Sequence, residues 1–173
     1  KAAKKLVKQG FAYKPILANF TEDANGDPDF TSHDFFINDD DEVEYIEHQV
    51  GCCTTEKPYL EQDPKREDRQ YIFAQAVIPI EYTKTAEIIK RKNGSKLSAE
   101  LCINEMSYDS KERVLLLDDV ILTGATLLGV DPVTKDEIGE GMEGARVDEI
   151  KDFIQENNSL FNHFDKDAKM IDL

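Results

Sequence analysis

The sequence predicts an α+β protein built on an antiparallel sheet or small barrel with helices around it, and three observations lead to this. First, two long segments rich in strand formers, 95–106 and 113–128, flank the turn SYDSKE and predict an antiparallel hairpin. Second, the segment 83–94 has apolar residues at helical spacing and ends in an Asn-Gly pair, a common helix stop. Third, helix patterns over 1–9 and 146–157 enclose the strands.

The length of the chain bounds its organisation. With 173 residues it can bury one sizeable core, and its size favours a single domain. We expect a helical extension over 1–12, a β domain over 13–145, and a C-terminal helix and tail over 146–173.

The first half of the chain alternates strand patterns with acidic loops. Strands are predicted over 11–20, 43–53 and 69–80, and Pro15 favours an edge position for the first of them. The acidic segment 21–42 carries Asn-Gly and Asp-Pro turn signals, which predict a long loop around a short apolar piece.

The charge of the chain narrows the classes of partner. The formal net charge is -15, and Lys57 is the only lysine or arginine between residues 21 and 63, a segment rich in Asp and Glu. Such a surface repels phosphate backbones, which disfavours direct nucleic-acid binding. Acidic segments of this kind stay solvated or dock onto basic partners.

The cysteines and the apolar runs indicate a cytosolic protein. Cys52 and Cys53 are adjacent and do not readily bridge to each other, and Cys102 makes the number odd, a pattern typical of a reducing compartment. The longest apolar runs are far shorter than the roughly 20 residues that span a bilayer, and no signal peptide is visible. We therefore expect no membrane partner.

Ser98 and Glu100 are the first residues that suggest chemistry. Strand alternation puts both on one face of the segment 97–104, although such alternation is also the default of a half-buried sheet. A serine nucleophile needs a base, normally a histidine within hydrogen-bond reach. Local pattern alone leaves Ser98 an ordinary polar residue of an amphipathic strand.

Three histidines are candidates for that base. His163 lies in the C-terminal tail, and His48 lies in a predicted strand where a structural role is the simpler interpretation. His33 precedes a short apolar stretch in a loop, a position that catalytic groups often occupy. No spacing rule connects His33 to Ser98.

Metal and cofactor sites are not indicated. There is no CxxC motif and no histidine at ligand spacing from a cysteine, which argues against zinc. The run Asp39-Asp40-Asp41 lacks the twelve-residue calcium loop with its central glycine, and GEGMEG is flanked by acids that repel phosphate. We expect no metal and no cofactor.

The order of the pieces resembles that of a known family. SHDFF supplies an early histidine, His33; YIEHQVGCC is a strand that contains a glycine; a further strand and a helix lead to KLSAEL with Ser98; and VILTGATLLGVDP closes the series. Over about residues 13–132 this order is similar to that of the prohead (capsid maturation) proteases of tailed bacteriophages.

The resemblance implies a fold like that of the herpesvirus assembly protease, a curved antiparallel barrel surrounded by helices. It implies that Ser98 is the nucleophile and His33 the general base, with backbone amides after the helix as candidates for the oxyanion hole. It further implies cleavage of scaffold segments and of the major capsid protein, as an oligomer inside the procapsid in the host cytoplasm.

One departure from the family pattern affects the expected activity. The family carries its acidic third residue in the closing strand, at the position that Gly124 occupies here. Without an orienting acid the imidazole tautomer is not fixed and the rate falls. Glu100 and Asp119 are the alternatives within this chain, and a second function stays open: an inactive protease fold that serves as a structural auxiliary of the capsid.

Overall fold

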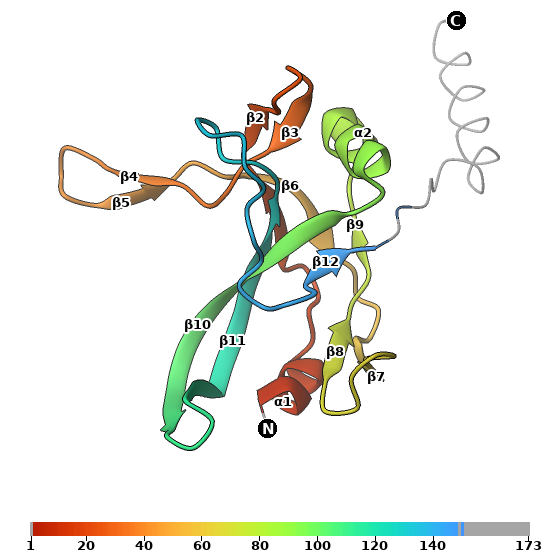
Figure 1. The fold of residues 1–173 in the computed structure, drawn as a ribbon, viewed down its shortest axis with the longest axis vertical. Coiled ribbons are helices and arrows are strands. Elements are labelled where there is room, and N and C mark those ends of the chain that lie inside the picture. The colour runs from red at the N-terminus through yellow and green to blue at the C-terminus, as the bar shows by residue number, and fades with distance from the viewer. Residues whose placement is uncertain (1, 149, 151–173) are drawn as a thin grey trace, which may run out of the picture.

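The computed structural model describes residues 2–148 and residue 150. Within them the chain forms two α-helices, α1 (Ala2–Gln9) and α2 (Thr83–Lys92), one short 3-10 helix, η1 (Ile80–Tyr82), and strands that make up most of the ordered elements. The structure is therefore mostly β, with helices beside a curved sheet (Figure 1). No helix among the described residues is long and apolar enough to cross a membrane.

Six strands form the main sheet, and its order does not follow the sequence. In spatial order they are β12 (Arg146–Val147), β10 (Ser95–Asp109), β11 (Val114–Leu128), β1 (Pro15–Ala18), β6 (His48–Cys53) and β9 (Ala76–Val77). Neighbours are antiparallel except β1 and β11, which run parallel. The predicted antiparallel hairpin is confirmed as β10 and β11, and the sheet as a whole is mixed.

The position of β1 corrects one prediction. Pro15 favoured an edge strand, but β1 lies inside the sheet, between β11 and β6. Ile16 pairs with Ala125 on one side and with Gly51 on the other. Proline is tolerated because Pro15 is the first residue of the strand, where the missing N–H interrupts no ladder.

Three separate hairpins occupy the acidic half of the chain. They are β2 (Phe20–Glu22) with β3 (Pro28–Phe30), β4 (Phe35–Ile37) with β5 (Val43–Tyr45), and β7 (Tyr59–Gln62) with β8 (Gln70–Phe73). The single loop predicted over 21–42 is therefore wrong. The strand predicted over 43–53 divides into β5 and β6, and the one over 69–80 divides into β8 and β9.

Short polar side chains explain why the acidic segments turn back on themselves. Asp23, Asn38 and Asp63 each accept a hydrogen bond from the backbone amide two residues further on, which closes the turn of each hairpin. The bond from the amide of Asn25 is the main cause that lowers the pKa of Asp23, and the bond from Lys65 does the same for Asp63.

Helix α2 forms where the sequence predicts it and packs its apolar face inward. Ile88 and Ile89 are buried in the core with Phe30, Val50 and Leu127. The predicted stop is confirmed, because Asn93 adopts the left-handed conformation that caps the helix. Its N-cap, Tyr82, makes no side-chain hydrogen bond, and the buried hydroxyl of Thr85 has no hydrogen-bond partner among the described residues.

The C-terminal helix prediction is wrong at its first two residues. A helix was expected from residue 146, but Arg146–Val147 forms β12 and pairs with Ser95 and Lys96 of β10. Apart from residues 148 and 150, the rest of that predicted helix lies outside the described residues, as does the tail.

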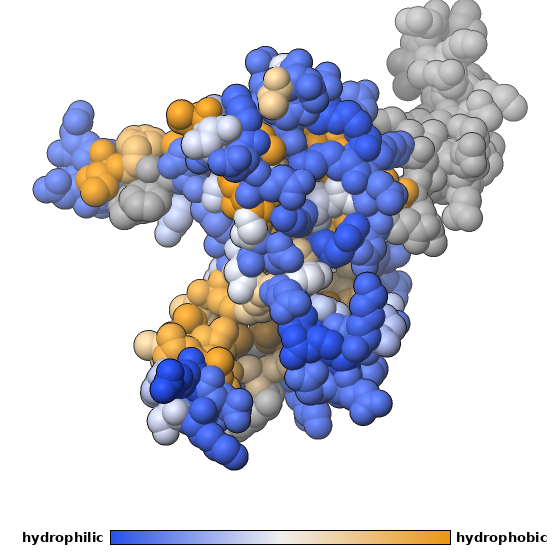
Figure 2. All heavy atoms as spheres, in the orientation of Figure 1, coloured by the Kyte–Doolittle hydropathy of each residue, from blue (hydrophilic) through white to orange (hydrophobic). Residues whose placement is uncertain are grey.

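The β10–β11 hairpin extends well beyond the body of the protein (Figure 1). We call residues 95–102 and 121–128 its proximal half, and residues 103–120 the distal ribbon. Several large apolar side chains of the ribbon are exposed: Ile103, Met106, Tyr108, Val114, Leu115 and Leu116. They contribute to the hydrophobic region at the lower left of Figure 2.

Candidate functional site

His33 lies two residues before the start of β4, and its ring is close to two carboxylates. Its Nδ1 atom is 2.9 Å from Oε1 of Glu100 and 3.6 Å from Oε1 of Glu47. A proton on Nδ1 is the tautomer that such acceptors favour, and it leaves Nε2 able to accept a proton. This is the form in which a histidine serves as a general base.

Glu100 is held in place from the neighbouring strand. The hydroxyl of Thr126 donates a hydrogen bond of 2.6 Å to Oε1 of Glu100, the same oxygen that faces His33. Thr126 is fully buried, so its position is fixed by packing. A buried donor of this kind restricts the carboxylate and, through it, the imidazole.

Ser98 lies on the same face of β10, half-buried and directly opposite Thr126. Residues two apart on one strand are separated by roughly 7 Å and point the same way. Ser98 and His33 are therefore both neighbours of Glu100, one through the strand and one through the ion pair. The structure pairs His33 with Glu100, one of the two acids that the sequence left open, and places Ser98 on the strand face of that acid.

Gly124 explains how Glu100 fits. It lies directly opposite Glu100 in the β10–β11 ladder, at the position where the resemblance leads one to expect an acid. A Cβ atom on Gly124 would be 3.5 Å from Cγ of Glu100 and 3.1 Å from Cγ of Pro15. The absent side chain leaves room for the carboxylate that arrives from the opposite strand.

Asp119, the other acid considered, is not part of this cluster. It lies in the distal ribbon opposite Glu105, and its carboxylate pairs with Lys5 of α1. Five residues along a strand correspond to about 17 Å, which separates Asp119 from the position opposite Glu100. The structure thus favours Glu100.

Glu47 is a member of the cluster that the sequence did not single out. Its side chain is 3% exposed, its Oε1 accepts a hydrogen bond from the backbone amide of Asp34, and its Oε2 has no hydrogen-bond partner among the residues that the structure describes. The only signal in the sequence was its position beside His48, in a strand with weak alternation. That signal drew attention to the histidine rather than to the acid.

The amides after α2 and the other two histidines were the remaining candidates for the site. The amides after α2 were candidates for an oxyanion hole, but those of Asn93, Gly94 and Leu97 already donate to carbonyls of the chain. His48 lies in β6 opposite Ala18, and His163 is outside the described residues.

Metal ligands and thiols do not add a second site. Among residues 2–148 and 150, no group of three or more His, Cys, Asp or Glu side chains is arranged to hold a metal ion. The cysteines are free thiols, and burial raises the pKa of the Cys53 thiol, which disfavours its reactive thiolate.

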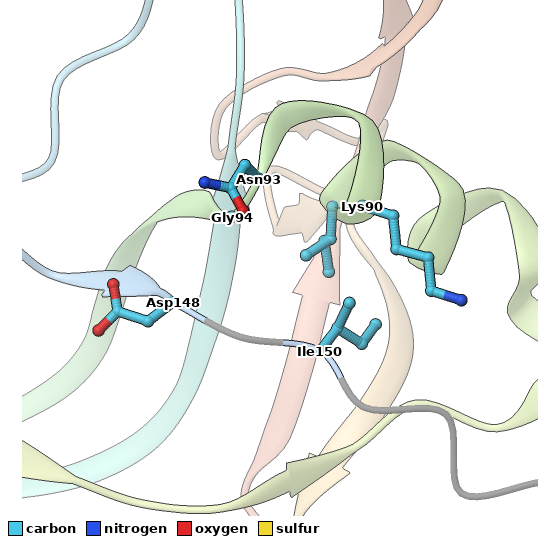
Figure 3. Close-up of a pocket in the computed structure, with 6 residues that line it drawn as sticks. Lys90, Asn93, Gly94, Asp148 and Ile150 are labelled. Carbon is cyan, nitrogen blue, oxygen red and sulfur yellow. The ribbon is translucent and has the colours of Figure 1, made fainter. Parts of the chain in front are cut away.

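A pocket of about 200 Å³ lies elsewhere, at the C-terminal end of α2. Figure 3 shows Asn93 and Gly94 at the helix end, and Asp148 and Ile150 in the segment that follows β12. None of its lining residues belongs to the His33 cluster. A helix C-terminus with a carboxylate nearby offers no anion site.

Fold and site together define a mostly β domain with one candidate cluster. In it the His33 ring is close to Glu47 and Glu100, and Ser98 lies on the same strand face as Glu100. The chain belongs to the YonD N-terminal domain family, whose model matches residues 1–171. No curated protein matches the chain, and no solved structure matches it.

Proposed function

We propose that this protein is a serine endopeptidase of the phage prohead maturation type, with Ser98 as nucleophile, His33 as general base and Glu100 as the acid that orients His33. The observation that carries the proposal is the 2.9 Å contact between Nδ1 of His33 and Oε1 of Glu100. This contact provides an orienting acid for His33. The resemblance places that acid at the position where this chain has Gly124.

The proposed chemistry is acyl transfer. The Ser98 oxygen attacks a peptide carbonyl while Nε2 of His33 takes the hydroxyl proton, and the imidazolium that forms is stabilised by Glu100. His33 then gives the proton to the leaving amine, and water repeats the sequence to release the acyl group. Glu100 does not itself become protonated, because its role is to fix the tautomer.

The curved sheet supports the proposal at a coarser level. Under it, the fold is a diverged form of the herpesvirus assembly protease, and the substrates are scaffold segments and the major capsid protein within a procapsid. The net charge of -15 suits basic stretches in such substrates.

Covalent labelling tests the assignment. The intact protein should react with a fluorophosphonate, with the adduct mapped by mass spectrometry to the peptide that contains Ser98. The Ser98→Ala variant should not be labelled, whereas Ser107→Ala, a change on the same strand in the distal ribbon, should be labelled normally. A folded protein that acquires no adduct on Ser98 would exclude the peptidase assignment.

A second candidate function is a structural component of the capsid. The observation in its favour is the distal ribbon, because exposed apolar side chains gathered on one element are typical of surfaces that assemble with other proteins. An unlabelled protein present in stoichiometric amount in mature particles would support this function instead.

A further inference from the structure

We propose that the β4–β5 hairpin, residues 34–46, which we call the acidic arm, docks the substrate of this site as an extended, basic polypeptide segment paired with β4. The inference rests on the proposed peptidase function, because it names the substrate class of that same site. It is carried by the attachment of the arm, by its open edges and by its charge.

The acidic arm begins and ends at the candidate site. His33 immediately precedes it and Glu47 immediately follows it. Its base is closed by two hydrogen bonds, from the amide of Ile46 to the carbonyl of Asp34 and from the amide of Asp34 to Oε1 of Glu47. A segment that runs along β4 is therefore led toward the imidazole of His33. Figure 1 shows the arm projecting away from the main sheet.

The main-chain groups of the arm are available for pairing. β4 and β5 form a sheet of two strands, so each has an open edge. The bonds Ile46 to Asp34 and Asn38 to Glu42 mark the inward-facing pairs, which recur every second residue. The amides and carbonyls of Phe35 and Ile37 consequently point outward from β4. Such an edge is a template for an added strand.

The side chains of the arm specify a basic and partly apolar partner. At its tip Asp39, Asp40, Asp41 and Glu42 are exposed, and within the described residues no lysine or arginine pairs with them. The Asn38 side chain holds the turn by accepting amide hydrogen bonds from Asp40 and Glu42, so these charges are presented on a fixed frame.

Exposed apolar side chains lie on the strands of the arm, between its acidic tip and its base. The exposed fractions are 48% for Phe36, 62% for Ile37 and 73% for Tyr45. Figure 2 shows orange side chains on this arm beside its blue tip. An extended segment that carries both lysines or arginines and apolar residues matches both features.

Glu47 provides an independent indication that the base of the arm receives a ligand. Its carboxylate is almost completely buried, yet Oε2 finds no donor within the described chain. A buried carboxylate oxygen without a donor is costly in a finished structure. A donor from a docked segment would satisfy it.

Binding of a synthetic peptide tests the proposal separately from catalysis. The probe is a fluorescein-labelled peptide of four Lys-Val repeats, measured by fluorescence anisotropy with the full chain carrying Ser98→Ala. We expect the triple variant Asp39→Asn, Asp40→Asn, Asp41→Asn to bind about tenfold more weakly, because it removes three charges while keeping the turn. Asparagine also tolerates the positive φ of Asp41.

A matched control removes the same charge from a different place. The triple variant Glu56→Gln, Glu61→Gln, Glu67→Gln changes exposed acids of the β7–β8 region and should bind within about twofold of the parent. A peptide of four Glu-Val repeats should not bind. If both triple variants weakened peptide binding equally, net charge alone would explain the effect, and the docking site would be overturned.

A second pair of variants tests the strand pairing. Ile37→Pro removes an outward-facing amide without breaking the bonded pairs of the arm, whereas Ile37→Val keeps that amide. We expect about fivefold weaker binding for the proline variant and an unchanged affinity for the valine variant. Unchanged binding by both variants, with a folded circular dichroism spectrum, would overturn pairing with β4.

The outcomes distinguish this inference from the function on which it rests. If the peptide binds through the arm while Ser98 takes no fluorophosphonate, the docking site holds and the peptidase function fails. If Ser98 is labelled and the arm variants bind as the parent does, the peptidase function holds and the docking site fails.

Discussion

The proximal half and the distal ribbon belong to one hairpin, yet their apolar side chains meet different surroundings. Leu127 and Leu128 of the proximal half are 0% and 2% exposed, whereas Leu115 and Leu116 of the ribbon are 64% and 44% exposed. The ladder between the two strands continues through both regions. What differs is the set of neighbours.

The neighbouring strands β12 and β1 pair only with the proximal half of the hairpin. β12 pairs with β10 only at Ser95 and Lys96, and β1 pairs with β11 only at Ala125 and Thr126. In the distal ribbon the two strands pair only with each other among the described residues. The strand pattern of the sequence thus establishes the β10–β11 ladder along its whole length. The packing of adjacent elements decides which part of the hairpin is buried enough to fix the side chains of a site.

The largest expected difference between the two regions concerns the carboxylates of β10. Glu100→Gln should slow fluorophosphonate labelling of Ser98 by about 10³ to 10⁴, because an amide stabilises the wrong tautomer of His33. Glu105→Gln, the corresponding change in the ribbon, should leave the rate unchanged. Equal rates for the two variants would remove Glu100 from the catalytic assignment.

Side-chain truncation should separate the regions by stability. Leu127→Ala should lower the free energy of unfolding by about 2–5 kcal/mol, because it empties a fully buried position. Leu115→Ala in the ribbon should change it by less than about 0.5 kcal/mol. Urea denaturation measures both. A large loss for Leu115→Ala would indicate that the ribbon is packed against something in solution.

A single methyl group tests the space around Glu100. In Gly124→Ala the new Cβ would lie 3.1 Å from Cγ and 3.2 Å from the carbonyl oxygen of Pro15, so β1 must shift slightly. We expect a loss of about 1–2 kcal/mol in stability. Gly139→Ala, where nothing lies within 4 Å, is the control and should cost less than about 0.5 kcal/mol. Identical melting curves would contradict the tight fit.

The smallest expected effect concerns the contact between α1 and the ribbon. Lys5→Ala removes the ion pair with Asp119, both partners being partly exposed, and should cost about 0.2–1 kcal/mol at low salt and less at high salt. Lys4→Ala serves as the control. A loss that did not change with salt would show that Lys5 contributes packing rather than charge.

Much of the fold was predictable because its signals are local. The β10–β11 hairpin follows from strand formers around one turn, and α2 follows from apolar spacing and its Asn93 cap. The hairpins of the acidic half were missed because Asp and Asn were interpreted as loop residues, although Asp23 and Asp63 close turns between strands. The inner position of β1 depends on pairing that no local pattern encodes.

The site was predictable in its residue types but not in its geometry. Ser98 and His33 came from the order of motifs, and no local pattern indicated that His33 would reach Glu100. Counting back from the tip, where Asp109 pairs with Val114, a regular ladder would put Ser98 opposite Ala125. The ladder shifts between Glu100 and Leu101, and this places Ser98 opposite Thr126 and Glu100 opposite Gly124.

That irregularity also governs how the length of the hairpin can change. If the unpaired residue Thr123 were deleted, Leu101 would still pair with Leu122 and Glu100 with Gly124, so the faces of the site would be kept and only the local kink of the bulge would be lost. Deleting a single paired residue of β11 instead would turn the side chains on one side of the deletion to the opposite face, unless the bulge absorbed the change. Two residues added together, one on each strand beyond the site, would keep the pairs of the site and only lengthen the ribbon. Relatives that keep this site are therefore free to vary the ribbon in matched pairs.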